Sequence, residues 1–172
     1  MILDTVSVGE LKTNCYILTK DDEVLVIDPG DEYNKIKPYL EDKTVVGVLV
    51  THDHSDHIGA IDYFDKDKVY DFKNLKAGNH EIGNFKFEVI YTPGHADDCL
   101  TYYFYDDGMM FTGDFLFKGT VGRTDFETGS PSAMRRSIEK IKKYPNAEVY
   151  PGHGMSTTLD EEKENNIYFL KI

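Results

Sequence analysis

The feature that most constrains this chain is the segment THDHSDHIGA at residues 51–60, which follows directly on the apolar run TVVGVLV. The segment holds three of the six histidines, His52, His54 and His57, together with the carboxylate of Asp56. A continuous run of β-branched and apolar residues predicts a buried strand. Loop residues that follow such a strand are well placed to converge on a ligand. We therefore expect the fold to hold a polar, ligand-binding group at the end of a core strand.

Three more candidate ligands stand at the ends of other predicted strands. They are His95 in TPGH, Asp114 in FTGD and His153 in PGHG, and each has a neighbouring glycine. Glycine lets the backbone approach a site closely and adopt unusual dihedral angles. Of the six histidines only His80 lies outside such a context, and we expect it to be structural.

Together these segments supply five imidazoles and two carboxylates, a ligand set suited to Zn²⁺, Fe²⁺ or Mn²⁺. The set is too large for one tetrahedral ion, which takes about four ligands. Two ions bridged by one carboxylate and one water would use all of it. The sequence therefore predicts a dinuclear metal site formed by His52, His54, Asp56, His57, His95, Asp114 and His153.

The remaining pattern is that of an α/β protein. Short β-branched segments separated by turn residues predict strands, and Gly83-Asn84 predicts a hairpin turn between two of them. Ser130 before Pro131 predicts the start of a helix, and Thr158 with Glu161 predicts the start of a final one. We find no linker or repeat, so we expect a single domain over residues 1–172, with one or two sheets covered by helices. The predicted strands are 2–8, 14–19, 23–30, 44–50, 81–94, 100–107, 109–114 and 147–154, with helices at 33–42, 58–64, 131–144 and 159–170 and a loop at 115–130.

Composition and charge exclude several classes of protein. A content of 40% apolar and 29% charged residues is globular. The net charge of −12 argues against general nucleic-acid binding, which requires positive charge. No segment approaches the ~18 apolar residues of a membrane span, and the N-terminus has no basic leader. Cys15 and Cys99 match no zinc or redox spacing. We expect a cytoplasmic protein with a small-molecule substrate and neither a nucleic-acid nor a membrane partner; its oligomeric state stays open.

The histidine motifs also carry a family resemblance. HDHSDH resembles the H-x-H-x-D-H signature of the metallo-β-lactamase superfamily, and TPGH, FTGD and PGHG resemble its remaining metal motifs, in the same order. NCYIL, VLVIDPG, GRTDF and YPGHG are most similar to the short form of the glyoxalase II-like (hydroxyacylglutathione hydrolase-like) hydrolases. The resemblance implies the metallo-β-lactamase fold, a four-layer αββα sandwich. It implies a first ion held by His52, His54 and His95, and a second held by Asp56, His57 and His153, with Asp114 bridging.

The same resemblance implies a chemistry. A metal-bridging hydroxide would cleave a thioester or a related ester, with two divalent ions, Zn²⁺ first and Fe or Mn as alternatives. Asp56 and Asp114 would orient the nucleophile. Arg123 stands where glutathione-using members place a basic residue against a substrate carboxylate, and it either anchors an anionic group or forms a salt bridge within its loop. Because Asp125 replaces an aromatic residue of those members, and their C-terminal helical domain is not found here, we expect poor hydrolysis of glutathione thioesters.

Other functions remain as alternatives. GRTDF also resembles the persulfide dioxygenases, which hold one mononuclear iron with two histidines and one aspartate; the PGHG motif fits a second metal better. RNA nucleases of the superfamily need a basic surface, which a chain of this charge lacks. A metal-dependent binding protein without turnover would have occupied metal sites but would cleave no activated ester.

Overall fold

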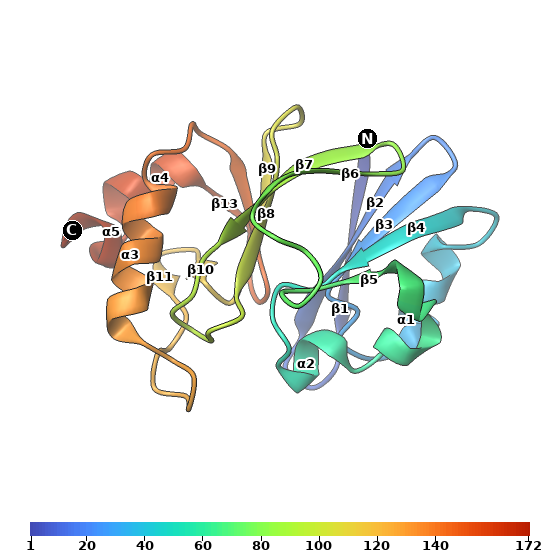
Figure 1. The fold of residues 1–172 in the computed structure, drawn as a ribbon, viewed down its shortest axis with the longest axis horizontal. Helices are drawn as coiled ribbons and strands as arrows, with labels where there is room; N and C mark the ends of the chain where they lie inside the picture. Colours follow the sequence, from blue (N-terminus) through green and yellow to red (C-terminus); the bar gives the residue numbers. More distant parts are fainter.

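The chain folds into two β-sheets that pack face to face (Figure 1). The computed structural model describes all of residues 1–172. The first sheet has the strand order β1-β2-β3-β4-β5, with bounds Ile2–Val8, Thr13–Lys20, Glu23–Ile27, Thr44–Leu49 and Val69–Tyr70. The second has the order β13-β12-β9-β8-β7-β6, with bounds Thr157–Thr158, Glu148–Pro151, Met109–Gly113, Leu100–Phe104, Phe85–Tyr91 and Gly78–Ile82. A two-stranded ribbon, β10 at Leu116–Phe117 and β11 at Thr120–Val121, lies between β9 and β12 in sequence.

The strand directions bring several candidate ligands to one edge of each sheet. In the first sheet β4 is parallel to β3 and β5. The histidine segment directly follows the buried end of β4. In the second sheet β12 is parallel to β9. Asp114 follows β9 and His153 follows β12, so the two residues leave adjacent strands at the same edge. A hydrogen bond from Leu100 N to Thr51 O joins the two sheets beside this edge.

Helices cover the outer face of each sheet (Figure 1). The second sheet is covered by α3 at Pro131–Ile141, α4 at Leu159–Asn165 and α5 at Ile167–Leu170. The first sheet is covered by α1 at Tyr33–Ile36, with 3-10 turns η1 at Lys37–Tyr39, η2 at Ile61–Tyr63 and η3 at Lys66–Lys68. The short helix α2 at Ser55–Ile58 lies at the end of this sheet, below the strands in Figure 1. None of these helices combines the length and the apolar character needed to cross a lipid bilayer.

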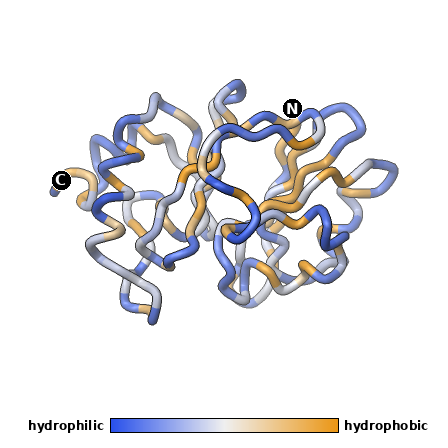
Figure 2. The backbone as a smooth tube through the Cα atoms, in the orientation of Figure 1, coloured by the Kyte–Doolittle hydropathy of each residue, from blue (hydrophilic) through white to orange (hydrophobic).

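The buried side chains form three hydrophobic clusters, which define four layers. The central cluster has 13 buried residues from both sheets, including Tyr16, Phe87, Phe104 and Phe111. A second cluster of 12 fills the space between the second sheet and α3 to α5, and a third of 9 lies on the outer face of the first sheet. Figure 2 shows the apolar segments following the strands. Helix, sheet, sheet and helix layers confirm the predicted αββα sandwich.

Local signals predicted two helix starts correctly and other helix boundaries poorly. The Ser130 side chain accepts a hydrogen bond from Ala133 N, and Thr158 accepts one from Glu161 N, so both predicted caps are present. The predicted final helix is interrupted at Asn166, whose side chain caps α5. The helix expected from Ile58 instead begins at Ser55 and ends at Ile58. The predicted 115–130 loop contains the β10–β11 ribbon.

Candidate metal centre

All seven residues predicted as metal ligands meet at the edge where the two sheets join. They form two groups, in each of which the ligand atoms lie within 4.8 Å of one another. Both groups draw side chains from both sheets, because the histidine segment follows β4 while the other residues follow β7, β9 and β12. The groups are His52, His54 and His95, and Asp56, His57, Asp114 and His153.

The first group consists only of imidazoles. The Nε2 atom of His95 lies 3.1 Å from Nδ1 of His54. The rings of His52 and His54 have centroids 4.6 Å apart and are nearly perpendicular. His52 and His95 are buried, whereas His54 is half-buried. Three ring nitrogens therefore face a common point at the border of the protein interior.

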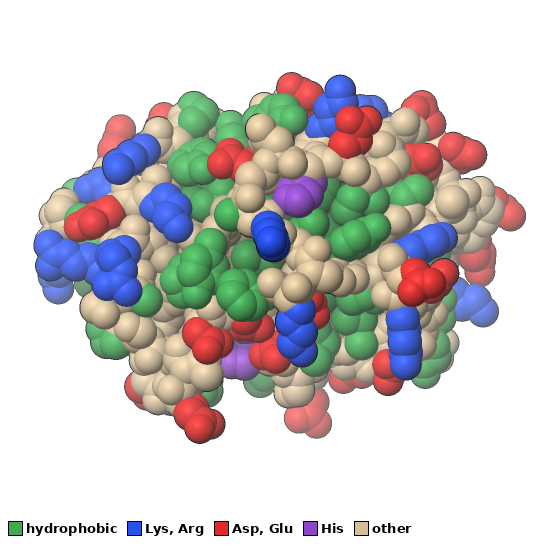
Figure 3. Space-filling view, viewed as in Figure 1, with side chains coloured by type: hydrophobic (Ala, Val, Ile, Leu, Met, Phe, Trp, Pro, Cys, Tyr) green, Lys and Arg blue, Asp and Glu red, His purple; other side chains and the backbone are tan.

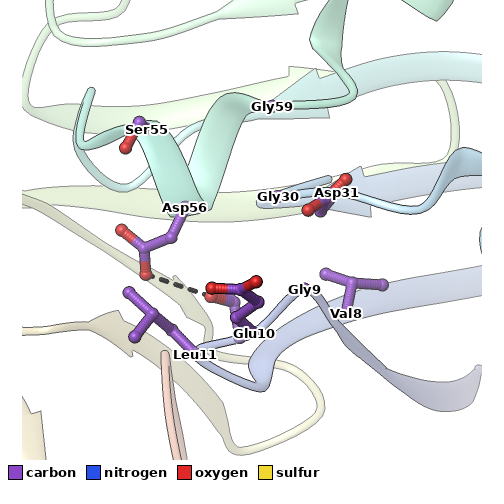
Figure 4. Close-up of a pocket in the computed structure, with 10 residues that line it drawn as sticks. Val8, Gly9, Glu10, Leu11, Gly30, Asp31, Ser55, Asp56 and Gly59 are labelled. Carbon is purple, nitrogen blue, oxygen red and sulfur yellow. Dashed lines mark hydrogen bonds between the residues drawn. The ribbon is translucent and has the colours of Figure 1, made fainter.

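The second group mixes imidazoles and carboxylates. Oδ2 of Asp56 lies 3.1 Å from Nε2 of His153 and 3.3 Å from Nε2 of His57. Asp56 also accepts a hydrogen bond from the hydroxyl of Thr13, at 3.0 Å. Figure 4 shows the Asp56 side chain leaving α2 toward the 9–11 segment. Asp56 is thereby fixed between α2 and the first hairpin of the chain.

Asp114 lies between the two groups. Its Oδ2 is 3.5 Å from Nε2 of His95 and 3.9 Å from Nε2 of His52, both in the first group. The same oxygen is 3.4 Å from Nε2 of His153, and Oδ1 is 3.2 Å from Nε2 of His57, both in the second group. One carboxylate therefore reaches both sets of nitrogens.

Hydrogen bonds behind three of the rings fix which of their nitrogens faces the centre. Nδ1 of His95 donates to Arg123 O at 2.9 Å, and Nδ1 of His153 donates to Leu11 O at 3.0 Å. Nδ1 of His57 lies 2.8 Å from Oδ2 of Asp28. Since a carbonyl or carboxylate oxygen can only accept, these Nδ1 atoms carry the proton, and Nε2 of a neutral ring is left with its lone pair.

Asp28 is a site residue that the sequence argument did not identify. Its Oδ1 accepts from Thr51 N and its Oδ2 from the Thr51 hydroxyl, at 2.8 and 2.6 Å, in addition to the contact with His57. Because the Thr51 hydroxyl donates to Asp28, it must accept from Nδ1 of His52, 3.0 Å away. Asp28 therefore orients one histidine directly and another through Thr51. The signal available was the motif VLVIDPG, which resembled the family without suggesting a role.

Glycines make room for the ligands. A Cβ atom on Gly152 would overlap Oδ1 of Asp114 and lie 2.7 Å from Cε1 of His57. A Cβ atom on Gly122 would overlap the backbone of Asp114 and lie 3.0 Å from Nδ1 of His95. Side chains at these positions would fill the space that the ligand groups occupy.

The charges of the two groups differ. Burial lowers the pKa of His52 and of His95, so their rings are neutral at pH 7. Burial alone would also lower the pKa of His57, but the charge of Asp28 and the nearby carboxylates raise it to about 12. Contacts with Asp114 and Asp56 raise the pKa of His153 to about 10. Burial favours the protonated forms of Asp56 and Asp114. Contacts with His153 and His57 nevertheless hold the pKa of both carboxyl groups well below the usual range.

The donor set fits divalent metal ions. Nε2 of His52, Nε2 of His57 and Oδ1 of Asp114 are buried atoms without a hydrogen-bond partner. Buried polar atoms are rarely left unpaired, because each such atom costs about 1–3 kcal/mol. All three point into the centre, where a cation would satisfy them. Imidazole nitrogen with carboxylate oxygen is a ligand set for Zn²⁺ and Fe²⁺ alike.

The other residues singled out in the sequence lie around or away from the centre. Arg123 forms the salt bridge within its loop, with both carboxylate oxygens of Asp125, at 2.6 and 2.8 Å. Cys99 is buried. Asp53 is exposed and its backbone N donates to Asp98. His80 lies on β6 and contacts Lys76 O, so no ligand atom of the centre comes from it.

The surroundings of the centre are acidic. A cavity of about 350 Å³ adjoins Asp56 and is lined by Glu10, Asp31 and Ser55 among others (Figure 4). A second cavity of about 330 Å³ includes Asp53 and Asp98. In the space-filling view, acidic side chains gather along the lower edge of the molecule, where a histidine is visible (Figure 3). Anionic substrates would therefore meet like charge near the site.

Comparison with known proteins identifies the family. The model of the Metallo-beta-lactamase superfamily matches residues 8–71 and 66–153. The chain therefore belongs to the metallo-β-lactamase superfamily. It is 34% identical to the probable metallo-hydrolase YqgX of Bacillus subtilis, over 92% of this chain and 93% of that protein. It is 28% identical to the hydroxyacylglutathione hydrolase GloC of Haemophilus influenzae, over 96% of this chain and 97% of that protein.

Solved structures agree with this placement. The structure of the B3 metallo-beta-lactamase BLEG-1 matches with a TM-score of 0.92 and 29% identity, over 98% of this chain and 99% of that one. The structure of TTHA1623 in a di-iron-bound form matches with a TM-score of 0.85 and 28% identity, over 96% and 99%. The chain is thus a metal-dependent hydrolase of this superfamily, with hydroxyacylglutathione hydrolases among its relatives.

Proposed function

We propose that this protein hydrolyses a thioester or a related ester, converting the ester and one water into a carboxylic acid and a thiol or alcohol. The observation that carries the proposal is the position of Asp114 between two complete groups of ligand atoms. Two divalent ions, when bound, supply a water of lowered pKa and positive charge that stabilises the developing oxyanion. Zn²⁺ is our first candidate, with Fe or Mn as alternatives.

The protein's own residues hold and orient this machinery. His52, His54 and His95 would hold the first ion, Asp56, His57 and His153 the second, and Asp114 would bridge them. The outer hydrogen bonds to Asp28, Leu11 O and Arg123 O keep the ring nitrogens aimed at the centre. A thiolate is a good leaving group, so no strong general acid is required. A single domain over residues 1–172, a small-molecule substrate and a cytoplasmic location are part of the same proposal.

Hydroxyacylglutathione itself is a candidate substrate. Asp125 stands in place of an aromatic residue of the glutathione-using members, which argues against efficient hydrolysis of glutathione thioesters. GloC carries the name hydroxyacylglutathione hydrolase and is matched over 97% of its length, so a protein of this size can bear that activity. S-lactoylglutathione therefore belongs in the substrate screen beside simpler thioesters.

The alternative is a persulfide dioxygenase with one iron held by two histidines and one aspartate. The second group, which has two carboxylates and two imidazoles within reach of one another, favours two ions instead. Anaerobic purification followed by metal quantification separates the two functions. About two metal ions per chain with thioester hydrolysis supports our proposal; one iron per chain, with oxygen consumption on glutathione persulfide, favours the alternative.

The residue test compares two histidines of one chain. His54→Ala should lower kcat/KM on thioesters by about 100-fold or more, because it removes a ring nitrogen from the first group. His80→Ala should leave activity unchanged, because His80 lies outside the centre. Full activity in the metal-free His54→Ala variant would contradict the proposed function.

A further inference from the structure

The aromatic residue nearest to the metal centre is Phe126, at the end of GRTDF. Its ring centroid lies 5.1 Å from that of His54 and 5.2 Å from that of His95, with the rings inclined by 65° and 86°. The residue is nonetheless 40% exposed. Leaving so much aromatic surface in water is unfavourable. The two histidines therefore cover only part of the Phe126 ring. The uncovered part of the ring borders the first group.

A neighbouring ion pair holds the ring in place. The guanidinium carbon of Arg123 lies 4.5 Å from the ring centroid of Phe126. That guanidinium is in turn held by both oxygens of Asp125. Stacking of a planar guanidinium on an aromatic ring, combined with a forked carboxylate contact, restricts all three side chains. Phe126 is therefore a preordered apolar surface, and binding against it would cost little side-chain entropy.

Apolar side chains also border the second group. Leu11, whose carbonyl oxygen accepts from His153, is exposed and lines the cavity beside Asp56. The ring centroid of Phe117 lies 6.2 Å from that of His153. We call Leu11, Phe117 and Phe126 the apolar rim. The nearby cation, Arg123, is already paired, so the rim offers apolar contact and no free positive charge.

We propose that Phe126 determines substrate specificity by packing against an apolar acyl group, so that the preferred substrates are thioesters whose acyl group is a hydrocarbon chain. This inference rests on the proposed thioester hydrolysis and names its substrate class. Each methylene that leaves water against the rim contributes favourably to binding. A 2-hydroxyacyl group gains less there, because its hydroxyl must give up water without a partner among these side chains.

The test is a series of acyl groups on one thiol. Acetyl, butyryl, hexanoyl and lactoyl thioesters of N-acetylcysteamine are hydrolysed by metal-loaded wild type, Phe126→Ala and Tyr105→Ala. Tyr105 is the matched control, an aromatic residue with 39% exposure in the turn after β8. We expect kcat/KM to rise with chain length in wild type and Tyr105→Ala. In Phe126→Ala it should fall about 10-fold for hexanoyl but less than about 3-fold for acetyl, mainly through KM, with metal content unchanged.

Two results would overturn the inference. The first is hydrolysis of the series by wild type with no dependence on chain length. The second is an equal loss of activity by Phe126→Ala on every ester together with loss of bound metal, as expected if the ring only supports the histidines. Binding of acetate, butyrate and hexanoate to the metal-loaded protein, measured by calorimetry, decides the inference even if no thioester is hydrolysed. Hexanoate should then bind wild type about 10-fold more tightly than acetate, and Phe126→Ala should bind the two alike. Equal binding of hexanoate and acetate by wild type would contradict the inference. Absence of thioester hydrolysis would contradict only the proposed function.

Discussion

At the scale of single residues, Asp28 shows that the centre depends on a side chain behind it. Asp28 contacts Nδ1 of His57, the nitrogen that faces away from the centre. It is buried, adopts the left-handed backbone conformation with φ of 52°, and connects Thr51, His57 and, through Thr51, His52. A carboxylate is the only side chain of this size that accepts at once from Thr51 N, the Thr51 hydroxyl and Nδ1 of His57. The local strain is therefore maintained by the contacts that the carboxylate makes.

Asp28→Asn should weaken metal binding by roughly 10- to 100-fold, because the new amide NH₂ faces donors instead of accepting from them. Competition with a chromogenic chelator measures the affinity. Asp21→Asn is the control, since Asp21 has a similar φ of 56° but is exposed in a hairpin turn. Unaltered metal affinity in Asp28→Asn would show that His57 and His52 need no carboxylate behind them.

The pairing of Arg123 with Asp125 makes a second prediction at this scale. Removing Asp125 leaves the guanidinium without its carboxylate partner, at an exposed position beside Phe126. Asp125→Ala should therefore raise kcat/KM for a thioester of 3-mercaptopropionate about three- to fivefold at low ionic strength, and added salt should reduce the gain. The double variant Arg123→Ala, Asp125→Ala should show no gain; a gain in both would rule out Arg123 as the cause.

The seven residues that meet at the centre were accessible to sequence reasoning because each stands in a short motif at the end of an apolar strand. Asp28 was not, since its partners Thr51 and His57 lie 23 and 29 positions away. Phe126 likewise carries no local signal of a place at the centre, because the motif GRTDF points to Arg123 and Asp125, whereas the fold brings the next residue against His54 and His95. Contacts between distant segments depend on how the two sheets pack, and no local sequence pattern predicts that packing.

At the scale of elements, the strand ends decide which residues meet. The apolar runs and the caps at Ser130 and Thr158 predicted most strands and helix starts, because these signals are local. β5 and β13, each two residues long, carry too little pattern to be predicted. The interruption of the last helix at Asn166 follows from tertiary contacts: its side chain donates to Thr120 O and to the buried Glu162.

The loop after β12 gives the prediction at this scale. Gly152→Ala would push a methyl group into Oδ1 of Asp114 and toward His57, both in the second group. We expect metal content to fall from about two ions toward one, since the first group keeps its three imidazoles. Gly154→Ala is the control: its φ of 79° makes alanine strained, but no atom lies within 4 Å of the new methyl. That variant should lose about 1 kcal/mol of stability and keep its metal. Two tightly bound ions in Gly152→Ala would contradict this account of the loop.

At the scale of the whole molecule, each group of ligands joins the two sheets. His52, His54, Asp56 and His57 follow the first sheet's β4, whereas His95, Asp114 and His153 follow strands of the second. An ion in either group therefore connects both halves of the sandwich. Because the unfolded chain lacks this arrangement, bound metal stabilises the fold, by about 2.7 kcal/mol at a free concentration 100 times Kd. Removal of metal should accordingly lower the Tm.

The two groups should release metal at different pH. In the metal-free protein the pKa values of His57 and His153 are raised to about 12 and about 10, so both rings carry a proton at neutral pH. Those protons stabilise the metal-free fold fully below pH ~6.5, and the contribution is lost as the pH rises through the raised values. An ion entering the second group must displace both protons. Burial lowers the pKa of His52 and His95, so an ion entering the first group displaces none from these two rings near neutral pH.

Affinity at the second group should therefore rise with pH by up to about 100-fold per unit between pH 6.5 and 8.5, while affinity at the first group stays nearly constant. Chelator competition at several pH values, combined with proton release measured by an indicator dye, checks this directly. On acidification we expect one ion to leave before the other, and His153→Ala to halve the proton release at the second group. Simultaneous loss of both ions with the same pH dependence would mean that the charges of Asp56, Asp114 and their histidines do not separate the two groups.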